Sequence, residues 1–176
     1  MLTGRHRLPG ADYPEIGAVV AKSLDTSGSS LPGHVKITPS GSGSRSADSA
    51  YLGPKYASMS LSGDKPLPNS KRPADLTDDA EKARQQIWNM VNNRFAMKRR
   101  TAETDAYVQS FQQAEELVKR ADIFDLSKES DKDRARYGSH DFGRHCLLAR
   151  RLLENDITFV QVSHSNYDTH NENFNF

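Results

Sequence analysis

A cluster of His, Asp and Asn residues near the end of the chain is the best candidate for chemistry. Asp168 and His170 flank a single residue, so a turn or an extended segment could direct both side chains to one ion. A carboxylate and a neutral imidazole suit a divalent metal, either zinc or a calcium-like ion. Asn173 would orient a ligand or a substrate oxygen, and His164 is a weaker supporting candidate.

The alternative interpretation is that this cluster is a polar turn without a functional role, because Asp, Thr, Ser and Asn are ordinary turn and cap residues. Two candidate ligands also fall short of the roughly three protein ligands that a catalytic zinc takes. The residues by themselves therefore leave both interpretations open, and they predict at most an incomplete metal site.

A β-branched strand over residues 157–162 leads directly into the cluster. Its near-continuous apolar run is typical of a strand buried in a parallel sheet. It follows a helix that the apolar spacing predicts over Asp141–Leu153. Because ligands of open α/β sheets bind beyond the carboxyl ends of the strands, the cluster stands at a favourable place. We expect an α/β fold in which residues 157–162 are the central strand of a sheet that also contains a strand around residues 35–38.

Three further helices are predicted before that point. Pro14 suits the first turn of a helix over residues 15–24, Asp78 and Glu81 form a capping box for a second helix, and a third begins near Glu103. Apolar side chains recur at helical spacing in all of them and in the helix over residues 141–153, which predicts that they pack in the core. They are Ile16, Val19, Val20 and Leu24; Ile87, Met90, Val91 and Phe95; Tyr107, Val108, Phe111, Ala114, Leu117 and Val118; and Phe142, Cys146, Leu147, Ala149, Leu152 and Leu153.

Residues 39–75 are dominated by Ser, Gly, Pro and Lys. A flexible linker is one interpretation. The aromatic residues among the turn residues of segment 51–56 instead favour a long surface loop that is packed by a few anchors, of the kind that often borders a binding site.

Composition excludes several classes of protein. A chain of 176 residues fits one domain, and its net charge of +1 gives no argument for a nucleic acid or an anionic membrane as a partner. The longest apolar runs are far shorter than the roughly 20 residues of a membrane helix. Cys146 is the only cysteine, so no internal disulfide forms, and its helical context predicts a small buried hydrophobe. Residues 1–7 do not resemble a signal peptide, and both ends look cut, which suggests an internal fragment.

Residues 2–5 read Leu-Thr-Gly-Arg, and further motifs stand at residues 52–56, 124–126, 128–129, 137–138, 142–152, 159–162 and 167–174. In this order the motifs resemble a large family of exported bacterial sulfatase-like proteins of unknown function. Residues 2–5 look like the tail of the sulfatase signature. The resemblance covers nearly the whole chain, and it implies part of one sulfatase-like α/β domain over residues 1–176. The implied fold is a partial alkaline phosphatase-like three-layer sandwich with a mainly parallel sheet, in a periplasmic or extracellular protein.

Alkaline phosphatases and sulfatases, to which that family is similar, hold divalent metals through an Asp and a His just after a core strand, with an Asn shortly downstream. Asp168, His170 and Asn173 follow this order, although the Asp–His spacing is shorter here than in alkaline phosphatase. The resemblance thus implies metal-dependent hydrolysis of phosphate or sulfate esters, carried by a small molecule or a polysaccharide. It places the nucleophile before Met1 and the remaining ligands after Phe176, so the chain alone is expected to be inactive.

Two other function classes stay open. The first is a noncatalytic relative that uses the same fold to bind polysaccharide at the cell surface. The second is a free-standing helical interaction protein, which the strand and polar loop at the end of the chain disfavour.

Overall fold

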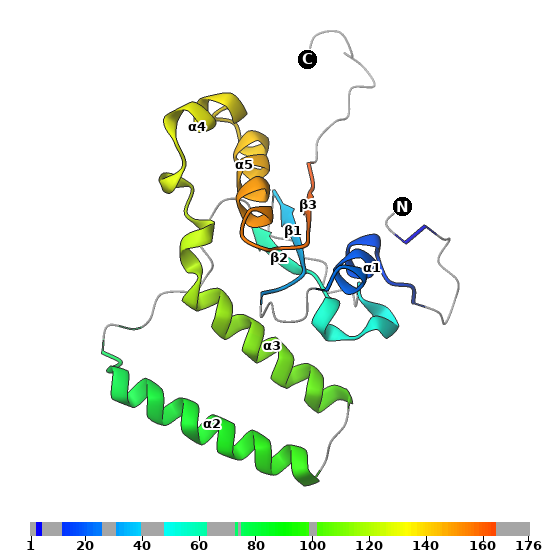
Figure 1. Ribbon diagram of the computed structural model, residues 1–176, viewed down its shortest axis with the longest axis vertical. Coiled ribbons are helices and arrows are strands. Elements are labelled where there is room, and N and C mark those ends of the chain that lie inside the picture. Colours follow the sequence, from blue (N-terminus) through cyan, green and yellow to red (C-terminus); the bar gives the residue numbers. More distant parts are fainter. Residues whose placement is uncertain are drawn as a thin grey trace.

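The computed structural model describes residues 3–4, 12–25, 31–39, 48–62, 73, 75–98 and 102–164. These residues form an α/β arrangement with a small parallel sheet (Figure 1), which confirms the α/β part of the predicted fold class. In chain order the elements are α1 (Ile16–Ser23), β1 (His34–Thr38), the 3-10 turns η1 (Ala50–Leu52) and η2 (Pro54–Tyr56), β2 (Met59–Ser62), α2 (Asp78–Lys98), α3 (Ala102–Lys119), η3 (Ala121–Phe124), η4 (Leu126–Lys128), α4 (Asp131–Tyr137), α5 (Asp141–Leu153) and β3 (Phe159–Val162).

The strands form a parallel sheet in the order β2-β1-β3. The prediction that β1 and β3 share one sheet is confirmed. The prediction that the last strand is central is wrong for the described sheet, because β1 occupies the middle and β3 pairs with β1 alone. Val35 lies opposite Met59 on one side and Val160 on the other. All four residues of β3 are half-buried, whereas four of the five residues of β1 are buried.

The second neighbour of the central strand β1 is β2, which lies in a segment that was predicted to be a loop. Within residues 39–75, the structure places η1, η2 and the strand β2. β2 has only four residues, Met-Ser-Leu-Ser, of which only Leu61 is buried. Such a short strand has too few apolar residues to stand out from a Ser-rich segment.

α5 begins and ends where the spacing predicted, and it packs on one face of the sheet. Leu148 and Leu152 join Val35 and Ile37 of β1 in the hydrophobic core. The side chain of His140 caps the start of the helix, because its Nδ1 atom accepts a hydrogen bond of 3.0 Å from the backbone N–H of Gly143.

The buried side of α5 is rotated from the predicted one, although Leu147, Ala149 and Leu152 are buried as predicted. Cys146 is only half-buried, and Leu153 is 51% exposed, contrary to prediction. His145 is buried instead. Positions 145, 148, 149 and 152 have the i, i+3, i+4, i+7 spacing of one helix face, and neighbouring positions point about 100° away from it.

α1 reverses its predicted orientation. Three large apolar side chains of the predicted stripe are exposed: Ile16, Val19 and Leu24. The buried residues are Gly17, Ala18 and Ala21. A Cβ atom on Gly17 would lie 2.3 Å from the Nε2 atom of His34, so only a residue without a side chain fits at this contact. Small residues therefore let α1 approach the sheet closely, and this contact decides which side of the helix is buried.

α2 and α3 lie side by side away from the sheet (Figure 1). Their contact includes the stacked rings of Trp88 and Phe111, with centroids 4.0 Å apart, and a hydrogen bond from Gln85 to Glu115. The predicted burial of the α2 stripe is wrong, because α3 covers only the side that carries Trp88. The exposed members are Ile87, Met90, Val91 and Phe95.

The start of α2 and the face of α3 also differ from prediction. The N–H of Ala80 donates to the hydroxyl of Thr77 over 3.2 Å, so Thr77 caps this end in place of the predicted Asp78 and Glu81. In α3, Leu117 is buried, whereas Val118 is 46% exposed and Ala114 is also exposed. The side chain of Tyr107 lies outside the described residues. Across the described ranges, no helix combines the length and the apolar character that crossing a bilayer requires.

Candidate functional site

The carboxyl edge of the sheet is the place where the sequence predicted chemistry. Because the three strands are parallel, they end at this one edge, at Thr38, Ser62 and Val162. The N–H of Ser163 donates to the carbonyl of Ile37 over 2.9 Å, so β3 remains attached to the central strand up to this edge.

His164 is the one predicted site residue that the structure describes. It is exposed just beyond β3, and its ring meets Phe142 of α5 edge to face, with centroids 5.0 Å apart. Asp168, His170 and Asn173 lie outside the described residues. Among the residues that are described, no group of three or more His, Cys, Asp or Glu side chains is arranged to hold a metal ion.

A buried ion cluster lies on the face of the sheet that α1 covers. The Nζ atom of Lys36 is 2.6 Å from Oε2 of Glu15 and 2.8 Å from Oδ2 of Asp48. Asp48 also accepts hydrogen bonds from the backbone N–H of Ser58, over 3.0 Å, and from its hydroxyl. The side chains of Lys36 and Asp48 are 10% and 2% exposed, so this cluster is almost closed to solvent.

The cluster sets the charge of its members. Burial disfavours the Lys36 ammonium, but its contacts with Asp48 and Glu15 outweigh burial and raise the lysine pKa. Burial also opposes ionisation of Asp48, yet the bonds from Lys36 and Ser58 keep its pKa below the usual range. Lys36 is therefore held as a charged, fully engaged ammonium, which suits a structural role and not a nucleophile or a base.

His34 lies beside this cluster on the same face of β1. It is fully buried, and its ring meets Phe159 edge to face at 5.4 Å. Neither ring nitrogen has a hydrogen-bond partner among the described residues. Burial lowers the pKa of His34, ahead of the opposing influence of Asp48, so the imidazole is kept neutral.

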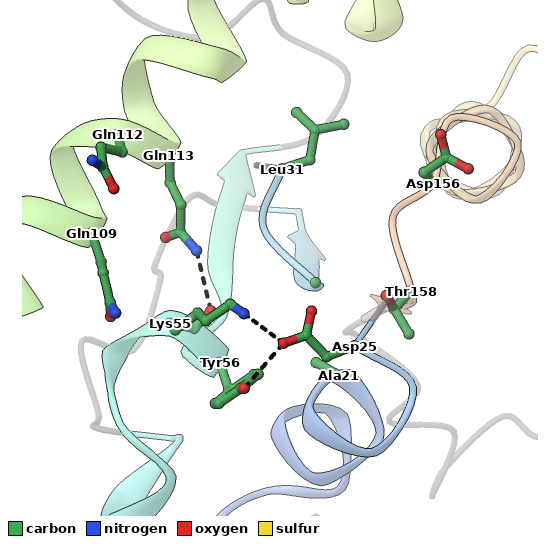
Figure 2. Close-up of a pocket in the computed structure, with 11 residues that line it drawn as sticks. Ala21, Asp25, Leu31, Lys55, Tyr56, Gln109, Gln112, Gln113, Asp156 and Thr158 are labelled. Carbon is green, nitrogen blue, oxygen red and sulfur yellow. Dashed lines mark hydrogen bonds and ion pairs between the residues drawn. The ribbon is translucent and has the colours of Figure 1, made fainter. Parts of the chain in front are cut away.

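A cavity of 260 Å³ lies at the opposite, amino edge of the sheet (Figure 2). It is bordered by residues just before each strand, by three glutamines of α3 and by the end of α1. The lining residues are Leu31 and Gly33 before β1; Lys55 and Tyr56 before β2; Asp156 and Thr158 before β3; Gln109, Gln112 and Gln113 from α3; and Ala21 and Asp25.

One wall of this amino-edge pocket is held by an ion pair. The Nζ atom of Lys55 lies 2.5 Å from Oδ2 of Asp25, which also accepts a hydrogen bond of 3.1 Å from the Tyr56 hydroxyl. The bond from Lys55 is the main reason that the pKa of Asp25 is lowered. The side-chain amide of Gln113 donates to the carbonyl of Lys55 over 3.1 Å and so ties α3 to this wall.

Sequence reasoning missed the amino-edge pocket. The aromatic residues of segment 51–56 suggested a loop with anchors near a binding site, and Tyr56 is one lining residue. The glutamines carried no signal, because a polar residue on a helix is ordinarily a solvated surface residue.

One family model matches residues 1–175, and its description is "Protein of unknown function (DUF1501)". No curated protein and no solved structure matches the chain.

Proposed function

We propose that this chain, which belongs to the DUF1501 family of proteins of unknown function, supplies Asp168 and His170 to the divalent-metal site of a hydrolase. The proposed substrates are phosphate or sulfate esters of a small molecule or a polysaccharide. The observation that carries the proposal is the course of β3. This strand is parallel to the central strand and ends at the carboxyl edge, where ligands of open α/β sheets bind.

The donor set fits such a metal. Asp168 and His170 follow Val162 by six and eight residues, which is a short tether to the carboxyl edge. His164 stands at that edge with its ring against Phe142, so a further imidazole lies close to the end of β3. A bound divalent metal would stabilise the charge that develops on the transferring group. Asn173 would orient a ligand or a substrate oxygen.

The layers of the described fold support a sulfatase-like assignment. The small residues of α1 pack against His34 on one face of β1, and α5 packs against Val35 and Ile37 on the other. Helices on both faces of a parallel sheet are the arrangement expected of a three-layer sandwich. We extend the proposal to the alkaline phosphatase-like superfamily and to a periplasmic or extracellular location.

The test is metal analysis of the intact protein after dialysis against a zinc-containing buffer and then a metal-free buffer. Asp168→Ala and His170→Ala should each lower the metal affinity by at least about 10- to 100-fold, the loss that removal of a mere supporting group commonly causes. Affinity should also fall as the pH drops toward about 6.5, because the imidazole must be deprotonated to bind.

Two control variants match these changes in residue type. Asp79→Ala alters an exposed aspartate in the first turn of α2, and His140→Asn replaces a histidine by another good helix cap. Both should keep the metal content of the unchanged protein. Equal metal content in Asp168→Ala, His170→Ala and the controls would contradict the metal proposal and favour the noncatalytic, polysaccharide-binding relative. Turnover of aryl phosphates and aryl sulfates then distinguishes a metal-binding enzyme from a metal-binding protein without activity.

A further inference from the structure

We propose that the amino-edge pocket binds one ring of an uncharged sugar. The pocket lies where the parallel strands begin, and the proposed metal site lies beyond the edge where they end. The two sites are therefore on opposite edges of the sheet, and this inference does not depend on the metal.

The pocket offers unused hydrogen-bonding groups. Among the described residues, the side chains of Gln109, Gln112 and Asp156 have no hydrogen-bond partner, yet all three border the cavity. Gln113 uses its amide N–H toward Lys55, which leaves its side-chain oxygen as an acceptor. A side-chain amide supplies both donors and an acceptor, and a sugar hydroxyl needs both kinds of partner. Figure 2 shows the three glutamines of α3 on one side of the cavity and Asp156 on the opposite side.

The charge of the lining disfavours an anion. Asp25 and Asp156 contribute two carboxylates and Lys55 contributes one ammonium, and that ammonium is already paired with Asp25. The other carboxylate is that of Asp156, which borders the cavity on the side opposite the glutamines (Figure 2). It repels a sulfate or a phosphate group but accepts hydrogen bonds from hydroxyl groups.

The volume and the apolar part of the lining match a single ring. A cavity of 260 Å³ is just below the range of about 300–1,000 Å³ that holds drug-sized ligands. Ala21 and Leu31 add apolar surface for the C–H groups of a sugar, and Tyr56 adds an aromatic ring.

The test is NMR titration of the uniformly 15N-labelled protein in the presence of EDTA, which removes any contribution of a metal site. The probes are the methyl glycosides of glucose, galactose, mannose and xylose, together with N-acetylglucosamine and its 6-sulfate. At least one uncharged probe should shift the backbone amides of residues 55–56, 109–113 and 156–158. We expect a Kd on the order of 1 mM, as befits a single small ring.

The variant Gln109→Ala/Gln112→Ala should weaken that binding about tenfold or more, since it removes two groups that bond the ligand. Alanine favours helix, so α3 should remain folded, and circular dichroism checks this. The matched control is Gln86→Ala, which changes an exposed glutamine of α2 outside the pocket and should bind as the unchanged protein does.

Several results would overturn the proposal: no uncharged probe binds, the shifted amides lie away from the pocket, the 6-sulfate alone binds, or the double variant binds like the control. None of these results bears on metal content. The failure of this proposal can therefore be told apart from the failure of the proposed metal site.

Discussion

On one face of β1, Val35 and Ile37 pack against Leu148 and Leu152 of α5. On the other face, Lys36 contacts two carboxylates near the start of α1, and His34 fits against the backbone of Gly17. Both faces exclude water, but they do so by different interactions. The α5 face depends on apolar surface, whose contribution scales with buried area. The α1 face depends on a set of partners, and the loss of one partner leaves the others buried without compensation.

The parallel register extends this contrast to the neighbouring strands. Ile37 lies opposite Leu61 and Val162, whereas Lys36 lies opposite Ser60 and Gln161. Because successive residues of a strand point to opposite faces, one choice of register fixes the character of both faces. The described sheet is therefore mainly apolar on the α5 face and mixed on the α1 face, where Phe159 meets His34. Three substitutions test this difference.

The largest effect is expected from Lys36→Met. The change removes the ammonium but leaves the carboxylates of Glu15 and Asp48 buried, so the free energy of unfolding should fall by about 3–5 kcal/mol. Urea unfolding at neutral pH measures it. Lys132→Met, an exposed position of α4, is the matched control and should change stability by less than about 0.5 kcal/mol. Equal stability of the two variants would mean that the buried ion cluster does not hold α1 on the sheet.

The next effect concerns the α5 face. Leu152 is fully buried and Leu153 is 51% exposed, so the two neighbouring leucines form a matched pair. Leu152→Ala should lower the free energy of unfolding by about 3 kcal/mol through lost burial and the cavity left behind. Leu153→Ala should cost less than about 0.5 kcal/mol. Urea unfolding measures both variants. Similar losses at the two positions would contradict the assignment of Leu152 to the buried side and Leu153 to the exposed side of α5.

The smallest effect is a pH dependence caused by His34. Burial lowers the pKa of His34 in the folded protein below the ordinary 6.5. As the pH drops below about 6.5, the unfolded chain therefore binds a proton at this histidine before the folded protein does. The free energy of unfolding should therefore have its full value above about pH 6.5. At lower pH it should decrease by up to about 1.4 kcal/mol for each pH unit. His34→Leu should flatten this slope between about pH 6.5 and the lowered pKa of His34. A slope that persists in His34→Leu would mean that other groups cause it.

Lys36 and Asp48 change the free energy of unfolding at other pH values, so they do not interfere with the measurement on His34. The raised pKa of Lys36 means that its stabilisation is present below about pH 10.5 and is lost above it. The lowered pKa of Asp48 means that its stabilisation is present above about pH 3.8 and is lost below it. Neither group titrates just below pH 6.5, where the effect of His34 begins.

Local patterns were enough for the elements whose signal is strong within a few residues. The helix Asp141–Leu153 has caps, a wide apolar stripe and a following β-branched strand, so its limits and its place on the sheet were predictable from the sequence. The strand around residues 35–38 and its place in one sheet with residues 157–162 followed from the same α/β pattern. The candidate metal residues Asp168, His170 and Asn173 came from residue type, residue order and the family resemblance, and they remain a prediction.

Other features were decided only by contacts between segments far apart in the chain. The orientation of α1 depends on the space beside His34, which the apolar pattern of the helix cannot reveal. β1 became central because Met59–Ser62 pairs with it, a pairing too short to leave a local signal. The amino-edge pocket needs α1, η2, α3 and the start of β3 to converge, and each of its polar residues reads as ordinary surface on its own element. Periodicity reports which side of an element is apolar, but the tertiary structure decides which side has a partner.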